Sequence, residues 1–185
     1  MVGLPFESLK SDAGFELSEI TFEGISNNDQ VQYWDGTKLN VLTYANRKAG
    51  LGWYENFTTL TSKKFAPGEA FWLKSKAPVK VVVAGKVAPV TAKLTTSDNG
   101  FTLVGSLVPV AYNVNDLTFE GISSNDQIQY WNGKKLVVLT YANRKAGPGW
   151  YENFTTLSSK TFNPMEGFWL KTKKATTVSF PSITK

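Results

Sequence analysis

The residues with the most evident capacity for chemistry are carboxylates that occur twice along the chain. Four acidic side chains recur at a constant separation: Glu23, Asp29, Glu55 and Glu69 return as Glu120, Asp126, Glu152 and Glu166. Two carboxylates that face one groove could hydrolyse a glycosidic bond. Nothing in the sequence fixes the separation of any two of them, and no other polar cluster accompanies them. We therefore predict no catalytic residues.

The residue types that are missing narrow the chemistry further. Among 185 residues there is no cysteine and no histidine, which excludes disulfides, thiolate nucleophiles and the usual proton shuttle at neutral pH. The segments 27–29 and 124–126 lack the dense, alternating oxygen ligands of a calcium loop, so we expect them to cap turns. The sequence predicts a protein that is not an enzyme and that has no metal site and no cofactor.

The charge is basic but dispersed. The formal net charge is +5 and the pI about 9.3, yet no run of basic residues exceeds two. Segments that bind nucleic acid usually carry denser clusters, and no stretch approaches the roughly 20 apolar residues of a membrane span. We predict no nucleic-acid partner and no membrane span. The first residues contain no secretion signal, as is also true of a mature, processed chain.

Arg47 and Arg144 are the only arginines, and both lie in the repeated text ANRKAG. A guanidinium group suits bidentate pairing with a carboxylate. The pairing could be a local salt bridge, to Glu55 and Glu152 or to Glu23 and Glu120. It could also be a contact with an anionic ligand or with another subunit.

Aromatic residues are concentrated in the repeated text, which holds all six tryptophans. Trp and Tyr faces stack on sugar rings, and aromatic residues are also enriched at protein interfaces. In the adjacent pairs Trp53-Tyr54 and Phe71-Trp72, successive strand residues point to opposite faces, so we expect one member in the core and the other on the surface. The candidates for assembly or glycan contact, arginines included, are Trp34, Trp53, Tyr54, Trp72, Arg47, Trp131, Trp150, Tyr151, Trp169 and Arg144.

The elements that must position these residues come from an internal duplication. Residues 21–76 align with 118–173 at an offset of 97 residues without a gap, and about 44 of 56 positions are identical. Substitutions between the copies keep core chemistry, as in Val31 and Ile128. They also keep turn chemistry, as in Asp35 and Asn132, each followed by glycine.

The pattern within each copy is that of short strands. Residues 30–34 and 38–44 flank Asp35-Gly36, the strongest short-range hairpin signal, in which both central residues have positive φ. We expect a polar loop at 45–52, a strand after Pro67-Gly68, and helical turns no longer than those near 17–20 and 114–116. The fold class predicted is all-β, with two tandem small antiparallel β-barrel or sandwich domains.

The copies are unequal at their starts. We place the first module at 1–86, a strand-like linker at 87–99 and the second module at 100–185. Met1-Val2-Gly3 aligns with Leu103-Val104-Gly105, so the first copy lacks most of the opening strand, and a sheet with a missing strand has an open edge. The residues that could supply a strand by exchange are Val90, Ala92, Leu94, Val178, Phe180 and Ile183.

The succession of Phe101-Thr102-Leu103-Val104-Gly105, TFEGI, QYW, GWY and a closing PGEAFWLK resembles a tandem all-β repeat module of bacterial secreted and cell-surface proteins. In that group an NLVG-like strand opens the module and a PG-x-G-[FY]-W strand nears its end. This sequence departs from the pattern where the opening strand of the first copy is truncated and at Met165, where a glycine is lost. The resemblance implies an extracellular or cell-surface location and a non-catalytic role.

Two functions follow as expectations. The first is an extracellular structural subunit that self-associates into a homopolymer, head to tail in a filament, sheath or surface layer, because a heterologous contact that does not close extends indefinitely. The second is a bivalent carbohydrate-binding module, in which two equal sites give avidity on a polysaccharide.

Overall fold

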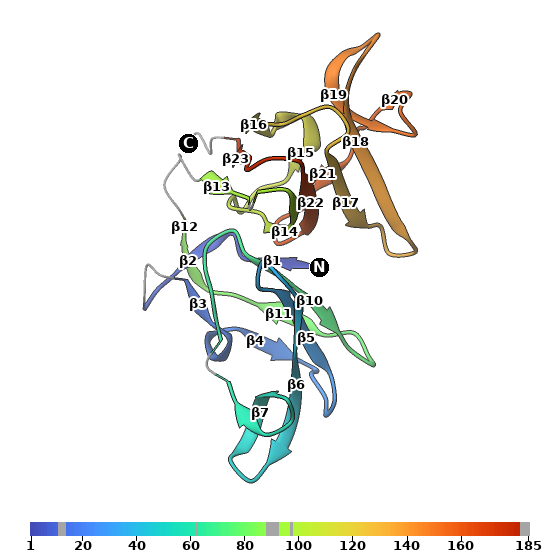
Figure 1. Cartoon of the computed structure of the whole chain (residues 1–185). Helices are drawn as coiled ribbons and strands as arrows, with labels where there is room; N and C mark the ends of the chain where they lie inside the picture. Colours follow the sequence, from blue (N-terminus) through green and yellow to red (C-terminus); the bar gives the residue numbers. More distant parts are fainter. Residues whose placement is uncertain (11–13, 62, 88–92, 97, 182–185) are drawn as a thin grey trace.

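The computed structural model describes residues 1–10, 14–61, 63–87, 93–96 and 98–181. Among them, helical structure is confined to two three-residue 3-10 turns, and the rest is strand and loop. The predicted all-β class is therefore confirmed. Figure 1 shows two halves, one above the other, with the N-terminal strand between them.

The elements follow the chain in nearly the same order in the two halves. Those of the first half are β1 (Val2–Gly3), β2 (Phe6–Ser8), β3 (Phe15–Glu16), η1 (Leu17–Glu19), β4 (Thr21–Glu23), β5 (Gln30–Trp34), β6 (Leu39–Arg47), β7 (Gly50–Glu55), β8 (Thr59–Leu60), β9 (Lys64–Phe65), β10 (Ala70–Lys74), β11 (Lys80–Val82) and β12 (Gly85–Val87). Those of the second are β13 (Lys93–Thr95), β14 (Gly100–Gly105), β15 (Tyr112–Asn113), η2 (Val114–Asp116), β16 (Thr118–Glu120), β17 (Gln127–Trp131), β18 (Leu136–Arg144), β19 (Gly147–Glu152), β20 (Thr156–Leu157), β21 (Thr161–Phe162), β22 (Gly167–Thr172) and β23 (Thr177–Ser179).

Each half is built on a six-stranded antiparallel sheet. The strand order is β1-β10-β5-β6-β7-β8 in the first and β14-β22-β17-β18-β19-β20 in the second. Smaller sheets accompany each large one: β2 with β12, β3 with β9 and β4 with β11 in the first half, and β15 with β21 and β13-β23-β16 in the second. The matching order is what the 97-residue offset predicts.

Each half has its own hydrophobic cluster, made from residues that alternate along the strands. Side chains at matched positions are fully or almost fully buried: Val31 and Ile128, Leu42 and Leu139, Trp53 and Trp150, Phe65 and Phe162, Phe71 and Phe168. Burial of one such side chain contributes about 1.5–3 kcal/mol. Each hydrophobic cluster packs against one face of its large sheet, and the candidate site described below lies on the opposite face.

The register of β1 confirms the predicted alignment of the two chain segments. Val2 pairs with Phe71 in the first half, and Val104 pairs with Phe168, the equivalent residue, in the second. β1 covers two residues of its neighbour, whereas β14 covers six. β1 thus corresponds to the last two residues of β14, and residues 100–103 have no paired counterpart among the described residues of the first half.

The hairpin between β5 and β6 is present, but its turn is longer than predicted. Trp34 pairs with Leu39, so four residues form the loop, and of these Gly36 alone has positive φ. The Asp35 carboxylate accepts hydrogen bonds from the backbone N–H groups of Thr37 and Lys38, each at 2.9 Å. These bonds close a wider turn than the two-residue type, which needs two residues with positive φ.

The prediction of a polar loop at 45–52 is wrong. β6 and β7 pair continuously as far as Arg47 and Gly50, so the segment is a second hairpin with Lys48 and Ala49 at its tip. Gly50 has φ +103°, a conformation that permits the tight turn. The same hairpin joins β18 and β19 in the second half.

The expectation that adjacent aromatics divide between core and surface is wrong for Trp53 and Tyr54. Both side chains are buried, as are Trp150 and Tyr151. Tyr54 pairs with Leu60 in the short strand β8, and this turn of chain covers the face of the sheet that alternation alone assigns to solvent.

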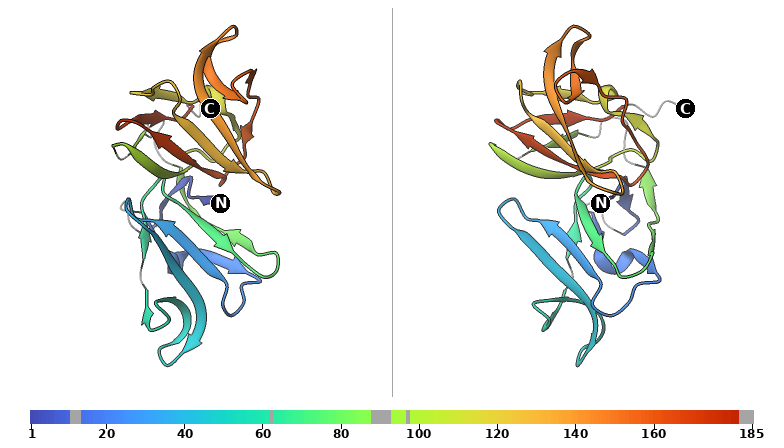
Figure 2. Two further views of the ribbon diagram at one scale, coloured as in Figure 1. Left: turned by 45° about the vertical axis from the view of Figure 1, so that its right-hand side comes forward. Right: turned by 90° about the vertical axis from the view of Figure 1, so that its right-hand side faces the viewer.

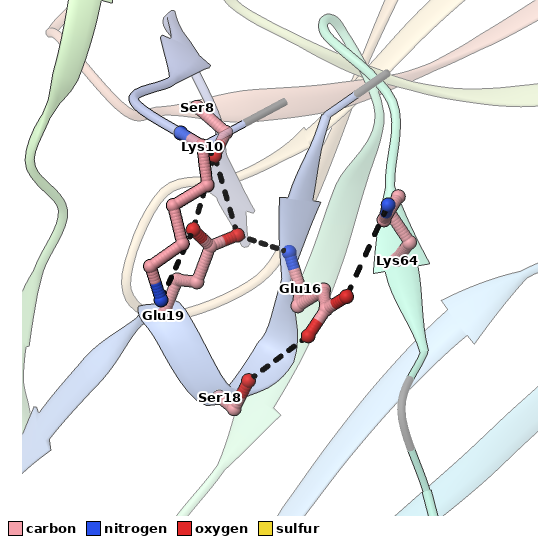
Figure 3. A network of polar contacts seen from close by, with 6 residues as sticks. All are labelled: Ser8, Lys10, Glu16, Ser18, Glu19 and Lys64. Carbon is pink, nitrogen blue, oxygen red and sulfur yellow. Dashed lines mark hydrogen bonds and ion pairs between the residues drawn. The ribbon is translucent and has the colours of Figure 1, made fainter. Parts of the chain in front are cut away.

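A stretch present only in the first half joins β2 to η1 through the network in Figure 3. The carboxylate of Glu19 accepts hydrogen bonds from the backbone N–H of Glu16 (2.8 Å) and from the hydroxyl of Ser8 (3.0 Å). The hydrogen bond from Glu16 is the main reason that the pKa of Glu19 lies below its ordinary value. β2 in turn pairs with β12. β12 ends at Val87, one residue beyond the predicted end of the first module at residue 86.

The two halves meet through reciprocal backbone hydrogen bonds. The N–H of Gly3 donates to the carbonyl of Met165, and the N–H of Gly105 donates to the carbonyl of Gly68, both at 2.7 Å. Gly68 and Met165 occupy equivalent positions, as do Gly3 and Gly105. The junction therefore has approximate two-fold symmetry, like an isologous dimer within one chain.

Candidate functional site

One strand edge of the first half is open where its counterpart is filled. Because the N–H of Gly3 is directed at Met165 and hydrogen-bonded positions alternate in an antiparallel pair, Val2 and Phe71 form the hydrogen-bonded pair. The next such positions on this edge are Leu73 and Ser75. Among the described residues, no strand pairs with them on this side. Their equivalents, Leu170 and Thr172, pair with Thr102 and Gly100.

The filled edge shows what the open one would accommodate. In the second half, Phe101 of β14 lies with its ring centroid 6.0 Å from that of Trp169, in a T-shaped contact. The ammonium group of Lys171 lies 5.3 Å from the same ring. Trp72 and Lys74 are the equivalent residues in the first half. They flank a position that is suited to an aromatic side chain.

An apolar hollow of about 350 Å³ lies beside this edge, between the outer faces of the two large sheets. Trp34 and Trp169 meet there edge to face, with centroids 5.7 Å apart. The indole N–H of Trp34 is buried without a hydrogen-bond partner among the described residues, and such a group costs about 1–3 kcal/mol. The lining consists of Trp34, Trp72, Phe101, Gln129, Leu136 and Trp169.

The residues predicted to exchange strands are placed within the second half where the structure describes them. Leu94 pairs with Val178, and both Val178 and Phe180 are buried in the second cluster. In this arrangement none of the three fills the open edge of the first half. Val90, Ala92 and Ile183 lie outside the described residues.

The aromatic candidates divide into two groups. Trp53, Tyr54, Trp150 and Tyr151 are buried, so in this conformation they do not offer a face to a sugar ring. Trp34, Trp72 and Trp169 are partly exposed at the hollow, and Trp131 is 46% exposed. Of the aromatic candidates named from the sequence, those with exposed surface therefore lie mostly at the junction of the two sheets.

The two arginines lie at the hairpin ends rather than in local salt bridges. Arg47 is 5.8 Å from the ring centroid of Phe57, and Arg144 is 6.0 Å from that of Phe154. No ion pair among the described residues involves either arginine, and Glu23, one of the suggested partners, pairs with Lys80 at 3.0 Å. The sequence did not identify either phenylalanine as a contact of an arginine. Asn56, which precedes Phe57 and favours positive φ, was the available signal.

The repeated carboxylates have structural partners. Glu69 accepts from Lys63 and Glu166 from Lys160. Asp29 is buried and accepts hydrogen bonds from the backbone N–H groups of Ser26 (2.8 Å) and Lys76 (3.1 Å), which confirms the predicted turn-capping role. Over the part of the chain that the structure describes, no group of three or more acidic residues could hold a metal ion.

Asp29 provides a test of this capping role through pH. Burial raises the pKa of its carboxyl, but the hydrogen bonds from Ser26 and Lys76 outweigh burial and bring that pKa below its ordinary value. A depressed folded-state pKa contributes stability above the unfolded-state value of about 3.9, and this contribution is lost as the pH falls through the folded-state value. We expect Asp29→Asn to cost about 2 kcal/mol at pH 7.

Urea unfolding at pH 7 and at progressively lower pH measures this difference between the wild-type chain and Asp29→Asn. The gap should narrow as the pH falls from about 4 through the folded-state pKa, because the unfolded wild-type chain takes up a proton that the folded chain binds only at lower pH. A gap that stays constant down to the lowest pH at which the fold persists would contradict the role assigned to the charge.

No helix within the described ranges is long and apolar enough to cross a membrane. No family model matches the sequence, and neither a curated protein nor a solved structure matches the chain. The proposals below therefore depend on the geometry of the site.

Proposed function

We propose that this chain is a non-catalytic structural subunit that joins neighbouring copies by strand addition at the open edge of β10. The observation that carries the proposal is the contrast between the two halves. The same edge is covered over six residues by β14 in the second half and over two residues by β1 in the first. An exposed edge of this kind is a template for pairing with another chain.

The open edge offers both affinity and specificity to an incoming strand. The N–H and C=O groups of Leu73 and Ser75 can bond a new strand in the register that β14 uses opposite Leu170 and Thr172. An aromatic side chain of that strand would lie between Trp72 and Lys74, as Phe101 does between Trp169 and Lys171. The segment of this type in a neighbouring copy is residues 100–103, which pairs with β22 of its own chain in this conformation, so we propose that it is donated by strand exchange.

The inequality of the halves makes the contact directional. Among the described residues, this edge is unpaired beyond Phe71 in the first half and paired in the second, so we propose that the donor and acceptor surfaces differ and that each subunit binds one neighbour ahead and one behind. Such a heterologous contact forms an open polymer unless its rotation closes a ring. A filament, sheath or surface layer outside the cell is the setting that we propose, in keeping with the resemblance to modules of secreted and cell-surface proteins.

The test of this function is a substitution that closes the edge to new partners. Ser75 is exposed, and a proline there removes an edge N–H while leaving the bonds of β10 to β5 in place. We expect Ser75→Pro to abolish concentration-dependent growth in mass, measured by light scattering, and to remove filaments seen by electron microscopy.

Ser75→Ala is the matched control, because it removes the same hydroxyl but keeps the N–H. It should assemble as the wild-type chain does, and both variants should keep the near-UV circular dichroism of the folded chain. A wild-type chain that remains monomeric at high concentration would refute the proposal. So would a Ser75→Pro variant that polymerises normally.

A further inference from the structure

The hairpins β6–β7 and β18–β19 project from opposite ends of the molecule, as both views in Figure 2 show. Each places one of the two arginines of the chain beside the tip, followed by a lysine: Arg47 and Lys48 in the first, Arg144 and Lys145 in the second. The two tips are far from the open edge of β10, and strand addition makes no use of them.

The guanidinium groups at the tips are available to a ligand. Within the described ranges, no hydrogen bond or ion pair engages the guanidinium group of Arg47 or Arg144, and each group lies over the ring of a phenylalanine. A guanidinium group presents five N–H donors in a planar fork that matches a carboxylate. A cation–π contact at this distance leaves the N–H donors of the fork unoccupied.

The phenylalanines are held in a strained conformation on the surface. Asn56 and Phe57 have φ of +49° and +61°, and Asn153 and Phe154 have +49° and +60°. Asparagine tolerates this region, but a bulky residue there costs on the order of 1–3 kcal/mol. Both rings are accessible, because Phe57 is 53% exposed and Phe154 47% exposed. Each pair forms the centre of a tight turn, which a hydrogen bond from Thr58 to Glu55, or from Thr155 to Glu152, closes at 3.1 Å. The turn places the phenylalanine ring beside the arginine.

A tyrosine hydroxyl contacts the backbone of each hairpin end. The buried Tyr54 donates a hydrogen bond from its hydroxyl to the carbonyl of Gly50 at 2.7 Å, and Tyr151 does the same to Gly147 at 2.6 Å. Each bond spans the hairpin end and holds it against the body of the sheet. In the second half, Arg144, Lys145, Tyr151 and Phe154 line a hollow of about 640 Å³. A preformed site of this kind avoids much of the ordering cost of binding.

We propose that each hairpin tip binds one carboxylate-bearing ring of an acidic polysaccharide. The guanidinium group would take the carboxylate in a bidentate pair, the neighbouring lysine would add charge, and the exposed phenylalanine ring would contact the apolar face of the sugar. The composition of the site favours a single charged ring over a nucleic-acid backbone, which needs a longer row of cations. Two equal sites at opposite ends make the chain bivalent.

The experiment uses the whole chain, with trigalacturonate and long polygalacturonate as probes. Isothermal titration with trigalacturonate should give two sites in the wild-type chain, one in Arg47→Gln or Arg144→Gln, and none in the double variant. Long polygalacturonate should bind at least about a hundredfold more weakly to either single variant, since avidity is lost. Arg47→Lys with Arg144→Lys keeps the charge but loses the fork, and should weaken trigalacturonate binding about tenfold.

Lys38→Gln with Lys135→Gln is the matched control. It removes the same total charge at equivalent positions in the other pair of hairpins, and should leave both stoichiometry and affinity unchanged. Equal losses in this control and in the arginine double variant would overturn the proposal, because they would show attraction by net charge alone.

Two further outcomes also decide the matter. Polyglutamate that binds as tightly as polygalacturonate, with the same arginine dependence, would overturn the assignment to a sugar in favour of an acidic peptide. Unchanged galacturonate binding in the arginine double variant would overturn the site itself. Ser75→Pro, which blocks strand addition, should bind trigalacturonate normally, so failure of either proposal can be distinguished from failure of the other.

Discussion

Gly105→Ala is expected to lower the free energy of unfolding by about 2–4 kcal/mol. A Cβ atom at this position would lie 2.6 Å from the carbonyl oxygen of Glu69 and 2.8 Å from the Cα of Gly3. Both neighbours are backbone atoms, which cannot turn aside as a side chain can. The two halves would have to separate, with loss of the hydrogen bond from Gly105 to Gly68. Overpacking of this kind typically costs 1–3 kcal/mol, and the lost bond adds about 1 kcal/mol.

Gly52→Ala is the matched control for this substitution. There the nearest atom to an added Cβ is the Cδ1 of Leu60 at 2.7 Å, which is the end of a flexible and largely exposed side chain that can rotate away. We expect a cost below about 1 kcal/mol. Urea unfolding measures both variants. Equal stabilities for Gly105→Ala and Gly52→Ala would show that the halves do not meet through β1 and β14 in solution.

The junction that this experiment tests was beyond the reach of sequence reasoning. The duplication indicates two similar sheets, and the alignment of Val2 with Val104 holds in the structure because both pair with the same phenylalanine of their own repeat. The contact between Gly3 and Gly105 could not be predicted in the same way. It joins residues about a hundred positions apart, and no periodicity or turn residue in either segment encodes it.

Local errors in the sequence-based expectations have identifiable causes. The tip at Lys48-Ala49 carries no glycine at its centre, and the turn depends on Gly50 just after it, so the segment resembled a loop. The burial of Tyr54 depends on the chain from β7 to β8 folding over the outer face of the sheet. Alternation along a strand predicts the direction of a side chain but not what covers it.

The candidate sites were predictable to different degrees. The alignment of Val2 with Val104 leaves residues 100–102 without a counterpart in this sequence, so an unpaired edge among the described residues of the first half could be anticipated. Its position on β10 required the register. The arginines could be singled out because the chain has only two and they occupy equivalent positions in the two copies. Their contacts with phenylalanine could not be predicted. Asn56-Phe57 lacks the glycine that usually marks two successive residues with positive φ.

Filling the open edge from within the chain is expected to abolish assembly and to stabilise the fold. In this variant Met1 is replaced by Gly-Phe-Thr-Leu, so that the added residues stand in the register of 100–103 in the second half. Ladder hydrogen bonds of about 1 kcal/mol each to Leu73 and Ser75, together with the new phenylalanine against Trp72, oppose an ordering cost of about 1–2 kcal/mol per residue. Four such bonds and burial of the phenylalanine side chain give about 6 kcal/mol, and ordering the three additional residues costs about 5 kcal/mol, which leaves a net gain of about 1 kcal/mol.

That gain corresponds to a rise of a few degrees in Tm for a chain of this length, and calorimetry measures it while light scattering follows assembly. Replacing the added phenylalanine and leucine with serine in the same extension is the control. It keeps the backbone but removes the aromatic contact, so it should block assembly weakly and raise Tm little.

Complete loss of assembly with the phenylalanine-bearing extension, and not with the serine control, would assign the affinity to the position between Trp72 and Lys74. Normal assembly with the edge filled would mean that neighbours join elsewhere, because a strand slot already occupied within the chain cannot accept a second strand.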